Sequence, residues 1–185
     1  MGSLSEVQQQ LILGCVLGDG YLRKKTNAHL QITHSIKQKE YVDWKYQILK
    51  NLVITPPKVY RGNAGRVGYR FFTRSIPEFT VFYDRFYQNG TKTIPSDIKL
   101  SPLSLAVWYM DDGSKSYKSC YFNSQQLDLI SQNNLMKALQ LLGIKSNLNK
   151  DKKYFRIRTL TSDTPKLITI IAPHIIKSMR YKIPV

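Results

Sequence analysis

Two acid–glycine junctions, each at the end of an apolar segment, divide this sequence into similar halves. In the first half, LILGCVLGDGYL places Asp19 before Gly20; in the second half, LAVWYMDDGSK places Asp112 before Gly113. The spacing between these aspartates also separates two segments of similar pattern, YVDWKYQIL and NLMKALQLL. Two further pairs follow in the same order, YRFFT with YFRIRT and KTIP with YKIP. Ordered matches of this kind indicate an internal duplication and predict a fold of two similar units.

Hydrophobic periodicity predicts the element order αββαββα in each half. In the first half the pattern predicts helices over 8–18, 37–52 and 79–86, with strands over 21–24, 29–35, 58–61 and 66–74. In the second half it predicts helices over 102–111, 135–142 and 165–176, with strands over 117–123 and 154–159. We therefore expect an α+β protein of two pseudo-symmetric αββαββα halves. The expected bounds are 1–90 for the N-terminal half, 91–103 for a linker and 104–185 for the C-terminal half.

The predicted strands have one apolar and one polar face. Phe155 and Ile157 alternate with Arg156 and Arg158, and the strand over 29–35 alternates in the same way. Such strands are typical of antiparallel sheets that pack on helices and leave their polar side open, here to a nucleic-acid groove. For any single residue an ordinary solvated sheet face explains the pattern equally well.

The chain carries a large excess of positive charge. Its 28 Lys and Arg against 12 Asp and Glu give a formal net charge of +16, whereas solubility of a small domain needs only about 2 to 8 charges. This excess favours a polyanionic partner, which could be nucleic acid, an anionic membrane surface or an acidic protein. Neither end of the sequence has a Lys-rich amphipathic helix with a Trp/Phe/Leu face, and no apolar stretch reaches about 18 residues, so nucleic acid is favoured and no membrane association is expected. Its two cysteines and three histidines lack the spacing of structural zinc ligands.

The two aspartates lie where a helix least tolerates a carboxylate. A helix C-terminus carries partial negative charge and unpaired carbonyl oxygens, so an acid there needs a cation nearby. Carboxylates and backbone carbonyls are ligands that suit Mg²⁺. A single Asp-Gly pair is more typical of a turn, but two at matching positions favour a metal site. The candidate metal-binding residues are Asp19 and Asp112 with their neighbours Gly18 and Asp111.

These residues resemble the LAGLIDADG homing endonucleases, in the single-chain form that carries two copies of the motif. Residues 11–20 are similar to the first copy and residues 105–113 to the second. TKTIPSDIKLSPLSLAVWYMDDGSK and MRYKIP extend the likeness to the omega-intron endonuclease branch, over nearly the whole chain. The resemblance implies that the two motif helices pack at the interface between the halves. It also implies that the antiparallel sheets form a saddle in the DNA major groove.

The resemblance implies an activity and the residues that perform it. Members of the family cut both DNA strands across the minor groove and leave 3′ overhangs, with Mg²⁺ bound by the last acid of each motif. Those acids correspond to Asp19 and Asp112, and Asp111 takes a secondary or structural role. The peripheral lysines of the family's active sites correspond to Lys92 and Lys182, although phosphate contact or plain solvation would explain either lysine. We expect Mn²⁺ to substitute for Mg²⁺, and Ca²⁺ to support binding without cleavage.

Double-stranded DNA is the expected partner, and polar side chains on the predicted strands and adjoining loops are expected to contact it. These residues are Arg23, Lys25, Gln31, Thr33, Arg61, Arg66, Arg70, Lys115, Lys118, Asn123, Gln125, Arg156 and Arg158. Gln31 or Thr33, and Asn123 or Gln125, are also candidates for the amide or acid that the family keeps near each metal. Two motifs in one chain predict a monomer that recognises a long asymmetric site and promotes intron or intein mobility.

Other functions stay open. Some members of the family are RNA-splicing maturases that act on their own intron RNA, and a non-catalytic DNA-binding protein or a basic RNA-binding or ribosome-associated module would also suit the charge. Both acids and both lysines are present, which favours the nuclease, because a protein that only binds gains nothing from carboxylates facing phosphates. The abundance of Lys, Asn, Ile and Tyr suits an AT-rich genome, which is compatible with an organelle (mitochondrion or chloroplast) or a bacterial cytoplasm.

Overall fold

The computed structural model of the chain describes residues 4–62 and 65–184. It divides into two compact units, Met1–Asp84 and Arg85–Val185, each built around a four-stranded antiparallel sheet. Within the described ranges no helix has the length and apolar character needed to span a membrane.

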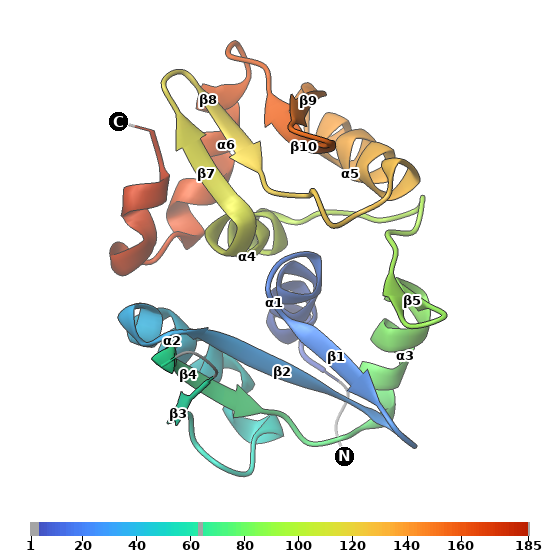
Figure 1. The fold of residues 1–185 in the computed structure, drawn as a ribbon, viewed down its shortest axis with the longest axis vertical. Helices are drawn as coiled ribbons and strands as arrows, with labels where there is room; N and C mark the ends of the chain where they lie inside the picture. Colours follow the sequence, from blue (N-terminus) through green and yellow to red (C-terminus); the bar gives the residue numbers. More distant parts are fainter. Residues whose placement is uncertain (1–3, 63–64, 185) are drawn as a thin grey trace. The chain divides into compact units, whose positions relative to one another are not determined.

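The first unit has its sheet in the order β1-β2-β4-β3. Helix α2 packs on β2 and β4, and α1 packs on α2 and β1 (Figure 1). The elements are α1 (Glu6–Leu17), β1 (Tyr21–Lys24), β2 (Ala28–Ser35), the 3-10 turn η1 (Ile36–Gln38), α2 (Lys39–Leu49), η2 (Lys50–Leu52), β3 (Lys58–Arg61), β4 (Val67–Phe72) and α3 (Pro77–Phe86), whose last two residues fall in the second unit.

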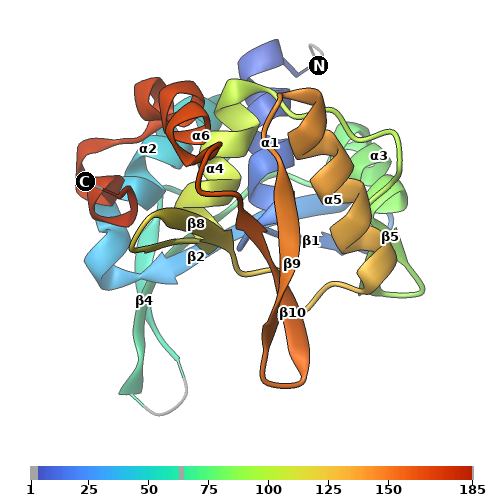
Figure 2. The same cartoon turned by 90° about the horizontal axis from the view of Figure 1, so that it is seen from above.

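The second unit repeats this arrangement, with its main sheet in the order β7-β8-β10-β9. Helix α5 packs on β9 and β10, and α6 packs on α4 (Figure 2). The elements are the small hairpin of β5 (Tyr87–Gln88) and β6 (Thr91–Lys92), then α4 (Pro102–Asp112), β7 (Gly113–Ser116), β8 (Ser119–Phe122), α5 (Leu129–Leu141), β9 (Ser146–Asp151), β10 (Tyr154–Thr159), α6 (Thr164–Ile171), η4 (Ala172–His174) and η5 (Lys177–Lys182). The predicted α+β class, with an antiparallel αββαββα repeat, is confirmed.

The strands of the second unit were the least well predicted elements. The segment 117–123 is not one strand, because β7 and β8 form a hairpin whose turn holds Tyr117 and Lys118. Tyr117 is 92% exposed, so this aromatic residue lies in a turn and not at a buried strand position. Strand β9, with the sequence SNLNKD, was not predicted, because it has few apolar residues and is formed by pairing with β10 along its whole length.

Two helices of the second unit also have different bounds from those predicted. Helix α5 begins at Leu129, well before 135, because Asp128 caps it by accepting a hydrogen bond from Ser131 N at 2.6 Å. The helix expected over 165–176 ends at Ile171, and the chain continues as the tighter turn η4. Pro173 lies in that turn, and a proline cannot donate the backbone hydrogen bond that an α-helix requires.

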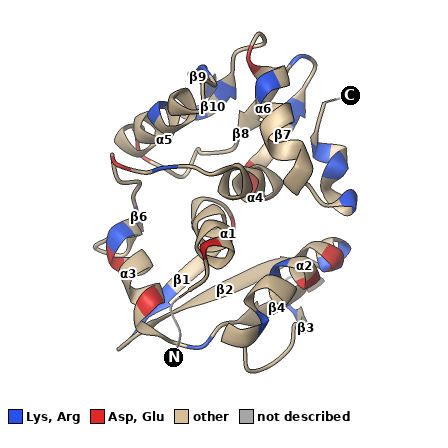
Figure 3. Ribbon diagram, turned by 180° about the vertical axis from the view of Figure 1, so that it is seen from behind, with Lys and Arg blue, Asp and Glu red and all other residues tan. Residues whose placement is uncertain are grey.

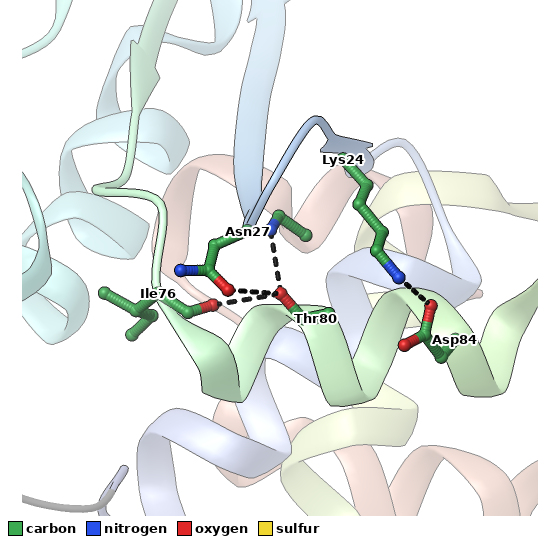
Figure 4. Close-up of polar contacts among 6 residues, drawn as sticks. Lys24, Asn27, Ile76, Thr80 and Asp84 are labelled. Carbon is green, nitrogen blue, oxygen red and sulfur yellow. Dashed lines mark hydrogen bonds and ion pairs between the residues drawn. The ribbon is translucent and has the colours of Figure 1, made fainter.

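In the first unit, polar side chains of α3 contact the turn between β1 and β2 and the residues next to it (Figure 4). The Thr80 hydroxyl accepts a hydrogen bond from Ala28 N at 2.9 Å and donates toward Asn27 Oδ1 at 3.3 Å. Lys24 Nζ lies 2.6 Å from Asp84 Oδ1. These contacts fix the far end of the β1–β2 hairpin, whose first strand begins directly after the Asp19–Gly20 junction.

The glycines of the two acid–glycine junctions allow the backbone to pass close to a carbonyl group of the preceding helix, α1 or α4. A β-carbon on Gly20 would lie 2.6 Å from the Cys15 carbonyl oxygen, and one on Gly113 would lie 2.2 Å from the Tyr109 carbonyl oxygen. Both distances are well inside van der Waals contact. Only glycine fits at either position, and this gives the repeated Asp-Gly pair a structural reason of its own.

We therefore expect Gly113→Ala to destabilise the protein. The added methyl group would have to push the backbone away from a helix carbonyl, and overpacking of this kind costs about 1–3 kcal/mol. Gly62→Ala is the matched control, since a β-carbon there meets Tyr60 Cε2 at 3.5 Å, an ordinary contact. Urea unfolding measures the difference, and an unchanged midpoint for Gly113→Ala would contradict the close approach.

Candidate active site and nucleic-acid interface

Asp19 lies in the turn after α1, beyond the helix end at Leu17, and its side chain is 48% exposed. The sequence pattern predicts this acid in the last helical turn, and the structure places it further from the helix. The buried ring of His34, on β2, lies beside it, with Nδ1 3.7 Å from Asp19 Oδ2. His34 was missed because the histidines show no ligand spacing. The signal in the sequence was its position on the apolar face of an alternating strand, in the same register as Leu30 and Ile32.

Lys45 of α2 lies behind His34 and is completely buried. Its Nζ is 3.1 Å from His34 Nε2 and 4.1 Å from the centroid of the Tyr41 ring. The two ring nitrogens of His34 thus face different groups, Nε2 facing Lys45 and Nδ1 facing Asp19. The three polar side chains therefore form a series from the core of the first unit to the exposed carboxylate.

Asp112 is the last residue of α4 and is half-buried, and Asp111 before it is buried. The carbonyl groups that end this helix have partners from distant parts of the second unit. Lys182 Nζ donates to the carbonyl oxygens of Met110 at 2.6 Å and Asp111 at 2.8 Å. Asn123 N donates to the Asp112 carbonyl oxygen at 2.9 Å, which places this candidate amide residue directly beside the acid.

Lys182 supplies a positive charge at the end of α4 that the local sequence does not contain. A cation at a helix C-terminus stabilises the helix by about 0.3–1 kcal/mol. The Tyr109 hydroxyl donates to the Lys182 carbonyl oxygen at 2.8 Å, and burial raises the pKa of Tyr109 far above its ordinary value, so the phenol stays neutral. Both the main chain and the ammonium of Lys182 are thus fixed. Its catalytic role stays a prediction.

The two acidic helix ends therefore have different basic surroundings, which are His34 with Lys45 in the first unit and Lys182 in the second.

The other predicted lysine, Lys92, is half-buried on β6. Gly18 is the C-cap of α1, and its N–H donates to the Gly14 carbonyl oxygen at 3.1 Å. Oxygen donors on partly exposed carboxylates are the chemistry that a hard divalent cation requires, so the residues present fit Mg²⁺ or Mn²⁺.

The predicted DNA-binding residues lie on the strands and the turns next to them, but they do not share one face. The exposed members are Arg23, Lys25, Arg61, Arg66, Lys115 and Lys118, and the half-buried members are Gln31, Thr33, Arg70, Asn123, Gln125, Arg156 and Arg158. Arg61 and Lys115 lie on the helix side of their sheets, because their registered partners are Val67 and the buried Cys120. Figure 3 shows basic residues on the β9–β10 hairpin, α6 and the C-terminal segment, and acidic residues at α1 and α4.

The alternation predicted for the strands is confirmed on β2 and holds only in part on β10. On β2, buried and half-buried residues alternate from Ala28 to His34. On β10, Ile157 is buried while Arg156 and Arg158 keep partial exposure on the open face, but Phe155, which was expected on the apolar face with Ile157, is 36% exposed near the tip of the hairpin. The helices cover the apolar faces, so the polar faces are the parts of the sheets that can meet a ligand.

Two αββαββα units, each with an acid–glycine helix end and a polar sheet face, define the two-motif class of DNA endonucleases. The sequence profile of the LAGLIDADG DNA endonuclease family matches residues 9–167, and the chain belongs to this family. The resemblance found in the sequence is therefore confirmed.

Two curated relatives carry different functional names. The chain is 28% identical to "Probable intron-encoded endonuclease 1" of Wickerhamomyces canadensis, over 98% of this chain and 85% of that protein. It is 27% identical to "Cytochrome b mRNA maturase bI2" of Debaryomyces hansenii, over 97% of this chain and 74% of that protein.

Solved structures show the same architecture. The homing endonuclease I-WcaI bound to its DNA recognition sequence matches with a TM-score of 0.91 and 25% identity, over 99% of this chain and 88% of that one. I-DmoI in complex with DNA and Mn matches with a TM-score of 0.60 and 15% identity, over 94% of this chain and 100% of that one, a likeness of fold.

The contacts of Lys182 lead to a prediction about stability. Lys182→Met removes two hydrogen bonds from a charged donor to the end of α4, and we expect a loss of about 1.5–3 kcal/mol in unfolding free energy. Lys177→Met is the matched control, because Lys177 is exposed in the same segment. Urea unfolding of both variants, with Lys182→Arg as the conservative substitution, measures the loss. Equal midpoints for Lys182→Met and Lys177→Met would contradict the capping role.

The buried series behind Asp19 leads to a second prediction. Lys45→Met fills a similar volume but removes the 3.1 Å contact to the buried His34 Nε2, and removing one partner of a buried hydrogen bond costs about 1–3 kcal/mol. His34 would lose a contact that fixes its ring. Where Asp19 is a metal ligand in a DNA-cleaving enzyme, we expect cleavage to slow by about 10- to 100-fold, the usual effect of removing a partner of a metal-site residue. The checks are the cleavage rate and the thermal midpoint, with the exposed Lys39→Met as control. A wild-type cleavage rate for Lys45→Met would show that Lys45 and His34 do not support Asp19 in cleavage.

Proposed function

We propose that this chain is a site-specific homing endonuclease that makes Mg²⁺-dependent staggered breaks, with 3′ overhangs, in a long asymmetric DNA site. Such breaks would promote the mobility of an intron or intein. The observation that carries the proposal is the recurrence of an acid–glycine junction after the motif helix of each unit, Asp19 in one and Asp112 in the other. The similarity to I-WcaI, which binds its DNA recognition sequence, supports it.

In this proposal the chain's own residues prepare a phosphodiester for hydrolysis. Asp19 and Asp112, with Gly18 and Asp111 beside them, would hold the divalent cations. Bound Mg²⁺ supplies Lewis acidity at the phosphate. His34 orients the Asp19 carboxylate from the protein side, and Asn123 lies against Asp112. Lys182 and Lys92 would offset the negative charge that develops on the phosphate in the transition state.

The proposal also includes the way in which DNA is held. Exposed lysines and arginines neutralise phosphates, and the open sheet faces meet base edges in the major groove. Two units in one chain provide both halves of the recognition surface, so we propose a monomer and an asymmetric site. I-DmoI has the same fold and its structure was solved in complex with DNA and Mn, which supports the proposal of a divalent-metal nuclease.

A cleavage selection tests this function directly. The purified chain is incubated with a randomised duplex library and with genomic DNA fragments in Mg²⁺, and cut ends are sequenced. We expect one family of long sites with 3′ overhangs, no cutting in EDTA, and cutting restored by Mn²⁺. Specific binding without any cutting would favour the non-catalytic DNA-binding protein instead.

A second function, assistance to RNA splicing, is favoured by one observation, the similarity to a cytochrome b mRNA maturase over 97% of the chain. Its partner would be structured intron RNA, bound through the same excess of positive charge. Self-splicing of a host intron transcript with and without the protein separates the two functions. Stimulated splicing without DNA cutting would replace the endonuclease with the maturase.

A further inference from the structure

Two arginines occupy equivalent positions in the two units. Arg70 on β4 and Arg156 on β10 each precede by three residues a threonine, Thr73 or Thr159. Each of these threonine hydroxyls accepts a hydrogen bond from a backbone N–H of the neighbouring strand, at 2.9 Å in the first unit and 3.0 Å in the second. The duplicated fold therefore presents the same side chain at the same place on both open sheet faces.

Each of these arginines lies over a tyrosine ring of an adjacent strand. Arg70 Cζ is 4.2 Å from the centroid of Tyr60, and Arg156 Cζ is 4.2 Å from the centroid of Tyr121. In both arginines Nε is buried and has no hydrogen-bond partner within residues 4–62 and 65–184. Stacking and burial hold the stem and Nε in place, so the two terminal amino groups are the donors that remain for a ligand.

The tyrosine platform in the first unit is built into the sheet. Tyr60 and Gly68 are registered partners on β3 and β4, and a β-carbon on Gly68 would lie 2.2 Å from Tyr60 Cε1. The glycine therefore lets the ring lie across β4, next to Arg70. A side chain at this position would displace the platform from the arginine.

Arg158 and Gln31, on the same faces, are engaged within the protein. Arg158 also lies near Tyr121, at 5.8 Å, but its Nη2 donates to Ser119 Oγ at 3.1 Å. Gln31 Nε2 donates to Thr33 Oγ1 at 3.2 Å. Arg70 and Arg156 differ from these residues because they are oriented by stacking and keep their terminal donors.

We propose that Arg70 and Arg156 each read a guanine in the major groove, at corresponding positions of the two halves of the DNA site. The inference rests on the proposed function only in placing duplex DNA on the open sheet faces. Two adjacent N–H donors match the O6 and N7 acceptors of guanine, and no other base offers that pair of acceptors there. A phosphate also accepts from an arginine fork, but flexible exposed lysines suffice for phosphates. A stacked, half-buried arginine loses little further freedom on contact, and this favours the base edge.

A binding selection in Ca²⁺ tests the inference without requiring cleavage. A randomised duplex library is selected with the wild type, Arg70→Lys and Arg156→Lys, which keep the charge and lose the fork. Tyr60→Leu removes one platform and leaves Arg70 in place. Arg74→Lys is the matched control, because Arg74 is an exposed arginine of the first unit that is not among the predicted DNA contacts. Thermal unfolding of each variant shows that it is folded.

We expect a guanine at one position in each half-site of the wild-type selection. Arg70→Lys should relax the guanine preference in one half-site only, and Arg156→Lys should relax it in the other half-site only. Tyr60→Leu should weaken the guanine preference in the half-site read by Arg70. Affinity for the preferred site should fall by about 5- to 150-fold, with non-specific affinity unchanged. A uniform loss across all sequences, as for a phosphate contact, or unchanged preferences in both variants, would overturn the inference.

These outcomes are distinct from a failure of the proposed function. If the selected site is bound but not cut in Mg²⁺, the endonuclease fails and base reading by the two arginines stands. If the site is cut and neither variant changes the base preference, the endonuclease stands and the reading fails. Absence of any sequence preference in the wild type would contradict both.

Discussion

Asp112→Asn is expected to abolish double-strand cleavage while leaving DNA binding in Ca²⁺ largely intact. The amide has the shape of the carboxylate but not its charge, so it is a poor ligand for a hard divalent cation. Electrostatic stabilisation of the transition state is lost with the metal, and the cleavage rate should fall by about 10²- to 10³-fold or more. Asp19→Asn should have an effect of the same size in the first unit.

Matched substitutions separate this effect from a general loss of negative charge. Asp97 is 75% exposed and forms an ion pair with Arg85 in the second unit, so Asp97→Asn should cut DNA at the wild-type rate. Cleavage of plasmid DNA, followed on denaturing gels that resolve each strand, measures the rates. Full double-strand cleavage by Asp112→Asn would remove this residue from the active site.

Affinity for DNA should depend steeply on salt. With a net charge of +16, a contact surface that neutralises about 6–10 phosphates would lose about 10³- to 10⁵-fold in affinity between about 50 and 200 mM salt. The physical cause is the release of condensed counterions, which is entropically favourable and contributes less free energy as the bulk salt concentration rises. The effect adds to any specific contact and applies to all sequences.

Fluorescence anisotropy of labelled duplexes over a salt series measures this slope. Replacing one phosphate-binding lysine, such as the exposed Lys25 or Lys118, by glutamine should reduce the slope by about one. A nearly flat salt dependence would contradict the view that the positive charge serves nucleic-acid binding.

The duplication and the strand alternation could be predicted from the sequence because both depend on local pattern. The buried and half-buried residues of β2 alternate as its apolar and polar letters do. Strand β9 could not be predicted in this way, because its stability comes from pairing with β10 rather than from its own composition. The turn at Tyr117 was missed because an exposed aromatic residue looks like a strand residue in a single sequence.

The acidic ends of the candidate site could be predicted, and most of their surroundings could not. Asp19 and Asp112 stand out because each follows an apolar helix and precedes a glycine. His34 and Lys45 come together only when β2 packs on α2, and Lys182 reaches the end of α4 from the far end of the second unit. No local pattern reports such contacts, since they depend on the tertiary fold.

The central claim is that the two acids hold the metal that acts on DNA. Its most direct test is a crystal structure of the chain with its selected DNA and Mn²⁺, in which anomalous scattering locates the cations. We expect anomalous peaks at coordination distance from carboxylate oxygens of both Asp19 and Asp112. Peaks at other acidic residues, with neither aspartate as a ligand in a complex that goes on to cut its DNA, would contradict it.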